Sequence, residues 1–332
     1  MKDKSQIANP KSQMFLGVDG GQSHTEATIA DENGNILGNG FGGASNHADI
    51  PGGRTRLQNA VIKSVGEALK NADLPPIEEI VFAAAHFGMT GEANYKEKII
   101  GEIVRADNLV IGHDAPTAHF GASAGTPGIV VIAGTGSVVF GMNEHGETAR
   151  AGGLGYLFSD EGSGFGLAAQ TIRLAIKEQD GIIAEDGLLK LVLEFFGKSE
   201  IRQITDEFYN GKISRDEIAK LARTAHDAAQ NGNKTLQREI GAGVEILCQN
   251  VKSVSDKLEF RGNFPVAGVG GMFDGTLFKK IFIDALKNRV PNAVYNNPRF
   301  GPAIGALLLA YRQANIEISG QLLENLENSQ NK

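Results

Sequence analysis

Three glycine-rich turns, each directly after an apolar stretch, are the segments best suited to chemistry. They span 19–25 (DGGQSHT), 133–137 (AGTGS) and 268–273 (GVGGMF). Such a turn exposes successive backbone N–H groups, which form a nest for anions. One turn alone also fits an ordinary hairpin. Three in order predict a nucleotide site in which the first two bind a polyphosphate and the third lies against the base or ribose.

Asp19 ends the first apolar stretch and immediately precedes a Gly-Gly turn. An acid there can orient water on Mg²⁺, which usually keeps several waters while it binds phosphates. We therefore expect Asp19 to serve Mg²⁺ through water. The histidine spacing does not favour zinc, because His113 and His119 are six apart and neither HxxxH nor HExxH occurs.

Strands must hold these turns, and their pattern occurs twice. Residues 14–19, 25–30 and 36–40 are predicted strands, and Asn33-Gly34 is a hairpin turn. The plan of strand, Gly/hydroxyl turn, strand, polar-Gly turn and strand begins again at Gly128, about 115 residues later. We infer two related domains, each opening with a β-meander.

After each meander the pattern becomes mixed α/β. Further strands are predicted at 79–85, 108–112 and 264–268, and helices at 54–71, 166–178 and 303–313. The stretch 182–258 is almost wholly helical in pattern. One apolar stripe of a long helix within it comprises Ile240, Val244, Leu247, Val251, Val254 and Leu258. Cys248 lies beside this stripe, which indicates a buried structural thiol.

The composition bounds the class of protein. A chain of 332 residues with 41% hydrophobic and 21% charged residues predicts a soluble protein of about two domains. The net charge of −7 argues against nucleic acid as a partner. The longest apolar runs are far short of the ~20 residues that a membrane span needs. A single cysteine excludes a disulfide framework and suits the cytoplasm.

Taken together, the motifs resemble a known superfamily. DGGQSHT, AGTGS and AGVGG are similar, in order, to the phosphate-1, phosphate-2 and adenosine motifs of actin, heat-shock ATPases and sugar kinases. The segments GASNH (43–47), HDAPTA (113–118) and AGGLGYLFSDEGSG (151–164) resemble the N-acetylglucosamine kinase branch of the BadF/BadG/BcrA/BcrD ATPase family. This family also contains the ATPase activators of benzoyl-CoA reductase and 2-hydroxyacyl-CoA dehydratase.

The resemblance implies an α/β fold of two RNase H-like (actin-like ATPase) domains with ATP and Mg²⁺ in a cleft between them. The first domain would comprise 14–117 plus 298–315, because the helix after Pro302 returns to it. The second would comprise 118–297, with a helical insert at about 182–258. Residues 1–13 are expected to form a tail, and 320–332 a fraying helix or tail.

Individual roles follow from the resemblance position by position. Asp114 matches the catalytic aspartate that accepts the proton of a sugar hydroxyl, although spacing alone favours a helix N-cap and the two roles can coexist. The other residues implied to contact the sugar are Asn46, Gly152, Gly153 and Asp160. Those implied to contact ATP are Gly20, Gly21, Gln22, Ser23, Thr25, Gly134, Thr135, Gly136, Gly270 and Gly271.

Two positions depart from the family pattern. Leu154 stands where an aromatic residue is common, and His86-Phe87 precede Gly88 where the family has a small pair. His86 fits either a sugar contact or a packed histidine, and packing is slightly favoured. Both departures leave the identity of the amino sugar open among N-acetylglucosamine, glucosamine and N-acetylmuramic acid.

The resemblance therefore predicts an ATP-dependent amino-sugar kinase that forms a homodimer. A non-catalytic ATPase or sugar sensor of the same fold is one alternative. The activator ATPases are another, but they hold a [4Fe–4S] cluster with two cysteines from each of two subunits. Cys248 is the chain's one cysteine, which disfavours that alternative.

Overall fold

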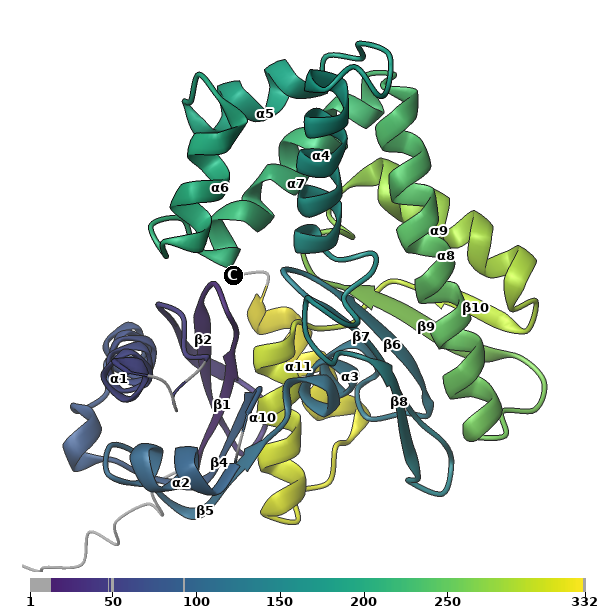
Figure 1. Ribbon diagram of the computed structural model, residues 1–332. Coiled ribbons are helices and arrows are strands. Elements are labelled where there is room, and N and C mark those ends of the chain that lie inside the picture. Colours follow the sequence, from purple (N-terminus) through teal and green to yellow (C-terminus); the bar gives the residue numbers. More distant parts are fainter. Residues whose placement is uncertain (1–12, 47, 49–50, 92, 331–332) are drawn as a thin grey trace, which may run out of the picture. The chain divides into compact units, whose positions relative to one another are not determined.

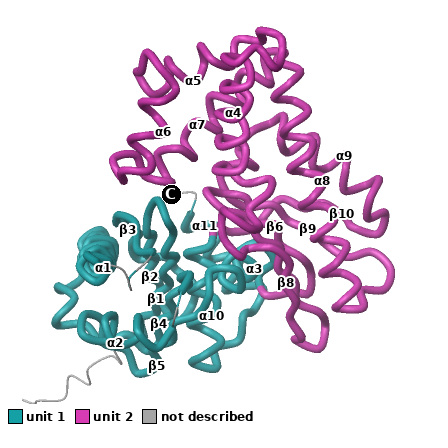
Figure 2. The backbone as a smooth tube through the Cα atoms, viewed as in Figure 1, with its two compact units in different colours: residues 1–124, 302–332 teal, residues 125–301 magenta. Residues whose placement is uncertain are grey.

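The computed structural model describes residues 13–46, 48, 51–91 and 93–330 (Figure 1). Most of the predicted N-terminal tail lies outside these residues. The chain forms two compact units (Figure 2): unit 1 spans 1–124 and 302–332, and unit 2 spans 125–301. None of the described helices is both long and apolar enough to cross a bilayer.

Unit 1 is built on a five-stranded mixed sheet of order β3-β2-β1-β4-β5. Its strands are β1 (Met14–Gly20), β2 (Thr25–Asp31), β3 (Ile36–Gly42), β4 (Val81–Met89) and β5 (Arg105–Gly112). The first three form the predicted antiparallel meander, and β4 and β5 run parallel to β1. The β2–β3 turn contains Gly34 at φ +87°, as the Asn-Gly signal predicts.

Helices cover both faces of this sheet. Leu16 and Val18 of β1 share a core with α1 (Gly53–Asn71) and α2 (Ala93–Gly101). Alternation turns Gly17 to the opposite face. There α10 (Pro302–Gln313) approaches so closely that a Cβ on Gly17 would lie 2.2 Å from the backbone nitrogen of Leu307. The short 3₁₀ helix η1 (Ile77–Glu79) precedes β4.

The helix after Pro302 also fixes where unit 1 ends. A Cβ on Gly305 would lie 2.0 Å from the carbonyl oxygen of Thr117 in α3 (Asp114–Ser123). Because α10 packs on α3, the whole of α3 belongs to unit 1. The chain therefore changes unit at 124/125 and 301/302, a few residues after the boundaries of 117/118 and 297/298 that the sequence suggests.

The C-terminal segment 320–332 is expected to form a fraying helix or a tail, and the structure describes it as far as residue 330. It forms α11 (Gly320–Gln330), which buries Leu322, Leu323 and Leu326. The side chain of Asn325 donates a hydrogen bond to the carbonyl of Asn33 in the β2–β3 turn. The three leucines supply the apolar face that a polar composition hides, so the helix packs instead of fraying.

Unit 2 repeats the topology of unit 1. Its strands are β6 (Gly128–Ala133), β7 (Ser137–Met142), β8 (Thr148–Gly152), β9 (Phe264–Val269) and β10 (Ala293–Asn296). Read from the meander edge, the order β8-β7-β6-β9-β10 corresponds to β3-β2-β1-β4-β5 of unit 1. The predicted duplication is therefore confirmed at the level of strand order and direction.

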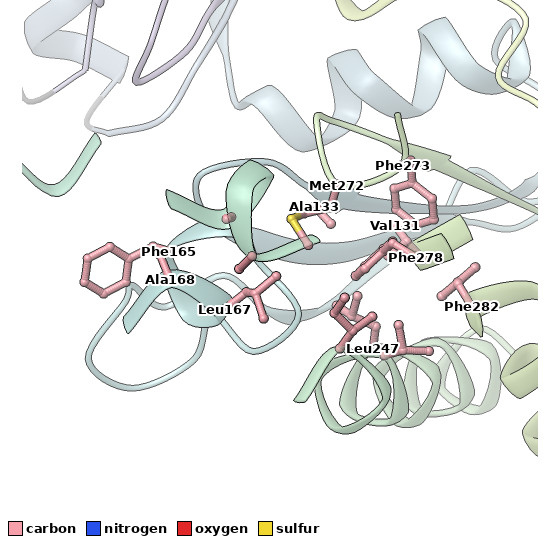
Figure 3. Close-up of a cluster of buried hydrophobic side chains, with 14 of the residues drawn as sticks. Val131, Ala133, Phe165, Leu167, Ala168, Leu247, Met272, Phe273, Phe278 and Phe282 are labelled. Atoms are coloured by element: carbon pink, nitrogen blue, oxygen red, sulfur yellow. The ribbon is translucent and has the colours of Figure 1, made fainter. Parts of the chain in front are cut away.

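Six helices accompany this second sheet among the described residues. They are α4 (Gly164–Gln179), α5 (Leu188–Phe196), α6 (Ile201–Tyr209), α7 (Arg215–Gln230), α8 (Lys234–Lys257) and α9 (Thr276–Arg289). The stripe predicted for α8 is buried along its length, with Leu247 facing the core shown in Figure 3. Cys248 is also buried there, and burial raises its thiol pKa to about 12, so it is an inert structural residue.

His86 is a packed residue of β4. Its side chain is buried, and the Gln313 amide nitrogen lies 2.6 Å from its Nδ1, which accepts in the neutral ring. A Cβ on Gly112 would lie 2.8 Å from its Nε2, which has no hydrogen-bond partner among the described residues. Burial lowers the pKa of His86 to about 4, so the ring is neutral at physiological pH.

This histidine should make the fold sensitive to acid. An unfolded histidine titrates near 6.5, so between about pH 6.5 and 4 the unfolded chain binds a proton that the folded chain does not. As the pH falls through this window, the free energy of unfolding should decrease by about 1.4 kcal/mol per pH unit because of His86 alone. Urea unfolding of the His86→Leu/Gln313→Leu double variant should show a shallower pH dependence than wild type. An unchanged slope would contradict this assignment.

Candidate active site

The parallel strands of unit 1 end in register. Asp19 of β1 pairs with Gly88 of β4, and Gly88 pairs with Gly112 of β5. The residues that follow each strand must therefore emerge at one edge of the sheet, the carboxyl edge where α/β proteins bind ligands. The first glycine turn, Thr90 and Asp114 are these residues.

Asp114 lies at the first turn of α3, with His113 as the residue that caps the helix. The expected N-cap, Asp114, is therefore one residue late, because His113 caps the helix. Thr90, directly after β4, donates its hydroxyl to Oδ2 of Asp114 at 2.8 Å. Among the described residues, Oδ1 accepts no hydrogen bond. Asp114 therefore presents one carboxylate oxygen that no described residue occupies.

A buried lysine supports the turn that carries Thr90. Lys96 of α2 is 2% exposed, and its ammonium group donates to the carbonyl of Thr90. A Cβ on Gly91 would lie 3.2 Å from that nitrogen. The lysine therefore fixes the turn whose hydroxyl orients Asp114.

Asp19 lies in an electrostatically strained position. Burial, with the negative charges of Asp114 and Glu26, raises the pKa of Asp19 to about 8. A nearby cation stabilises the ionised form of carboxyl groups whose pKa is raised by burial and by neighbouring negative charge. No group of three metal-ligating side chains occurs among the described residues. A single carboxylate in this position fits a cation held mainly by water and phosphate, as Mg²⁺ commonly is.

The first glycine turn is tied to the GASN segment. The N–H of Gly21 donates to the carbonyl of His24, and the N–H of Ser45 donates to the carbonyl of Gly21. A Cβ on Gly20 would lie 2.5 Å from Ser45 Oγ. Gln22 is half-buried and Ser23 is exposed, so this part of the turn is accessible.

Thr25 differs from its expected role. It is fully buried, and its hydroxyl donates to the carbonyl of Gly43 at 2.8 Å. The hydroxyl therefore supports the GASN segment and is not available to a phosphate.

Asn46 has the features of a binding residue. It is 5% exposed, and its side-chain oxygen has no partner among the described residues. Its carbonyl accepts a hydrogen bond from Arg56 of α1 at 2.7 Å, which fixes the backbone. A buried amide oxygen without a hydrogen-bond partner destabilises the fold, and a ligand that donates a hydrogen bond to it would remove this cost. His47, the last residue of GASNH, lies outside the described residues.

In unit 2 the other two glycine turns meet. The N–H of Met272 donates to the carbonyl of Ala133, and a Cβ on Gly270 would lie 2.9 Å from the nitrogen of Gly134. Figure 3 shows Ala133 and Met272 side by side above the core. A Cβ on Gly134 or Gly271 would meet no atom within 4 Å. Open space therefore lies beside both turns, as a ligand requires.

The start of α4 completes this turn cluster. The N–H groups of Gly164 and Phe165 donate to the carbonyls of Gly134 and Thr135. Ser163 caps α4 by accepting from Gly166, and its hydroxyl donates to the carbonyl of Asp160. The SDEGSG segment is thus bonded directly to the 133–137 turn.

Asp160 is 7% exposed and links several parts of unit 2. Its Oδ1 accepts from the N–H of Ser137 at 3.3 Å, and its Oδ2 from Arg215 at 2.8 Å. Burial raises its pKa, while the Ser137 hydrogen bond and the Arg215 charge oppose that shift. The carboxylate is therefore a structural acceptor as well as a candidate ligand.

Gly152 and Gly153 both adopt positive φ, +74° and +70°. A Cβ on Gly153 would lie 2.8 Å from the Val138 side chain, so this bend needs glycine. The loop that follows exposes apolar side chains, with Leu154 at 69% and Phe158 at 81%. Loops that expose several large apolar groups commonly contact a ligand or partner.

The sequence matches the BadF/BadG/BcrA/BcrD ATPase family over residues 16–310. The chain belongs to this family. It is 28% identical over 325 residues to an N-acetyl-D-glucosamine kinase of Dictyostelium discoideum, covering 90% of this chain and 98% of the other.

Two further relatives are described as kinases of the same class of sugar. Identity is 27% over 258 residues to an N-acetylmuramic acid/N-acetylglucosamine kinase of Clostridium acetobutylicum, covering 77% of this chain and 84% of the other. A crystal structure from Chromobacterium violaceum, provisionally described as an N-acetylglucosamine kinase, superposes with a TM-score of 0.73 at 26% identity. That match covers 91% of this chain and 100% of the other. The pair of like sheets is thus the fold of a sugar-kinase-like ATPase.

Two polar residues of this family member were not predicted. Thr90 follows a parallel strand as Asp114 does, and that shared position could have identified it. Arg215 is 55 positions from Asp160, and a lone arginine in a helical stretch carries no local signal of that contact.

Asp19 generates a direct test of the cation site. Asp19→Ala should weaken binding of the Mg²⁺ complex of a non-hydrolysable ATP analogue by about ten-fold or more, the size of one hydrogen bond to a charged group. The melting temperature should hold or rise, because the substitution removes an acid whose ionised form is disfavoured in the fold. Titration calorimetry and thermal unfolding measure the two effects. Asp107→Ala, an exposed acid of β5, is the control, and equal binding in all three proteins would remove Asp19 from the site.

Proposed function

We propose that the protein transfers the γ-phosphoryl group of ATP to an amino sugar, with N-acetylglucosamine converted to its 6-phosphate as the expected reaction. Glucosamine and N-acetylmuramic acid are the other acceptors to test. The observation that carries the proposal is the alignment of Asp19, Thr90 and Asp114 at the carboxyl ends of β1, β4 and β5. The relatives supply the acceptor class, since those named above are kinases of such sugars.

The nucleotide would be held by the backbone of the glycine turns. Unit 1 contributes Gly20, Gly21, Gln22 and Ser23, and unit 2 contributes Gly134, Thr135, Gly136, Gly270 and Gly271. The space beside Gly134 and Gly271 supports this assignment. Mg²⁺, positioned through water by Asp19, would neutralise charge on the phosphates.

The acceptor would be oriented by side chains with unused acceptor atoms. Asp114 is the proposed catalytic base, because Thr90 occupies Oδ2 and leaves Oδ1 for the proton of the reacting hydroxyl. The buried side-chain oxygen of Asn46 would accept a hydrogen bond from a sugar hydroxyl. In unit 2 the proposed contacts are Asp160 and the backbone of Gly152 and Gly153.

We place the enzyme in the cytoplasm, as a homodimer whose partners are the sugar and ATP. The single buried cysteine and the net charge of −7 are compatible with this setting.

A panel of sugars tests the activity directly. ADP release should occur with ATP, Mg²⁺ and at least one amino sugar, and the product should carry phosphate on the 6-oxygen by nuclear magnetic resonance. Glucose and buffer alone serve as controls. Absence of ADP release with every hexose and amino sugar would refute the kinase assignment and favour a non-catalytic sugar sensor.

Asp114→Asn separates a catalytic carboxylate from a helix-terminal one. The amide keeps the size of the side chain but cannot take a proton, so kcat should fall by at least ~10². Affinity for the ATP analogue should change little. Thr90→Val should cause a smaller fall that Thr90→Ser largely restores, because the hydroxyl only orients the carboxylate. Turnover of Asp114→Asn within a few-fold of wild type would exclude the catalytic role.

A further inference from the structure

Arg215 brings a nearly buried positive charge from the helical part of unit 2 to the 133–137 turn. It is the first residue of α7, directly after Ser214, whose capping box with Glu217 fixes the helix start. Its side chain is 17% exposed. A Cβ on Gly136 would lie 3.2 Å from its Nη2 and 3.0 Å from Oδ2 of Asp160. The ion pair therefore lies directly against the turn.

The guanidinium group is held from several directions. Nη2 donates to Asp160 at 2.8 Å. The Tyr156 ring centroid lies 4.9 Å from the guanidinium carbon and that of Phe165 lies 5.5 Å away, within range of cation–π attraction. Tyr156 belongs to the loop after Gly153, and Phe165 to the start of α4. One side chain thus contacts both segments that border the turn.

Asp160 connects Arg215 to the backbone of the 133–137 turn. Its other oxygen accepts from the N–H of Ser137, the residue after Gly136. Arg215, Asp160 and Ser137 therefore form a continuous chain of contacts from α7 to the turn. The Nε of Arg215 is buried without a hydrogen-bond partner among the described residues.

Stability alone does not explain this pair. A buried ion pair gains little over apolar residues of similar size, because desolvation offsets the attraction. The pair also lies at a glycine turn and not within the apolar core of unit 2. A binding group must be held in place by supporting side chains that are themselves fixed by packing and hydrogen bonds, and this pair has both.

We propose that Arg215 is a positioning residue for phosphoryl transfer: through Asp160 it fixes the 133–137 turn in the form that binds the nucleotide phosphates. This inference rests on the proposed function, in which that turn binds ATP. It adds a residue outside the motifs to the machinery of the reaction.

Nucleotide affinity and turnover test the proposal. Arg215→Met removes the charge but keeps an apolar chain of similar length. It should weaken binding of the Mg²⁺ complex of a non-hydrolysable ATP analogue by about ten-fold, typical for loss of a supporting partner, and should lower kcat. Arg215→Lys keeps the charge and should restore part of both. Arg202→Met is the matched control, because Arg202 of α6 forms an exposed pair with Asp206.

A pH profile distinguishes positioning from a merely structural role. The charged groups that act on Asp160 are Arg215 from α7 and Glu161 beside it, and the N–H of Ser137 opposes its protonation. Loss of Arg215 removes one influence that lowers the Asp160 pKa. The acid limb of kcat/KM should therefore move to higher pH in Arg215→Met, return toward wild type in Arg215→Lys, and stay unchanged in Arg202→Met.

Different results would overturn the role of Arg215 and the proposed function. A folded Arg215→Met protein with nucleotide affinity within two-fold of wild type and the same pH profile would overturn the inference. If Arg215→Met does not fold, Arg215→Gln, which keeps a donor but no charge, is measured in the same way and judged by the same limits. Absence of sugar phosphorylation by the wild type would defeat the proposed function, and the nucleotide titrations would still decide the role of Arg215.

Discussion

Parallel strand register is the constraint on which the candidate site depends. Hydrogen bonding pairs Asp19 with Gly88 and Gly88 with Gly112, so three loops from distant parts of the sequence must begin at one edge. In unit 2 the pairing of Ile132 with Val269 has the same effect on the two remaining turns. A shift of one residue in either ladder would also turn every core side chain to the wrong face. The apolar core and the placement of the polar loops are thus fixed by the same hydrogen bonds.

Glycine gives these turns and strands the steric room that the site requires. At Gly17 a side chain would strike the backbone of α10, and at Gly270 it would strike the neighbouring turn. Elsewhere the glycines leave room: nothing lies within 4 Å of a Cβ on Gly134. The high glycine content therefore serves two opposite needs, contact between backbones and vacant volume beside them.

The sequence predicts the elements well where periodicity and turn chemistry agree, as in both meanders and the stripe of α8. It predicts less where a residue acts through distant partners. The sequence predicts Thr25 as a phosphate ligand, but its hydroxyl donates a hydrogen bond to the carbonyl of Gly43, which only the folded sheet brings near. The polar composition of 320–330 hides the three leucines that α11 buries. Arg215 has no local pattern, because its partner Asp160 lies on a separate segment.

The packing of α10 on β1 sets an order of events during synthesis. Residues 302–313 close the face of a sheet whose first strand begins at Met14, and all of unit 2 lies between them in the chain. Domains generally fold as units while the ribosome advances. Unit 2 can therefore complete its core from contiguous chain, whereas unit 1 must wait with the apolar side of Phe15 and the narrow groove at Gly17 uncovered. The first strand of the sheet to be made is thus among the last parts of the fold to be covered.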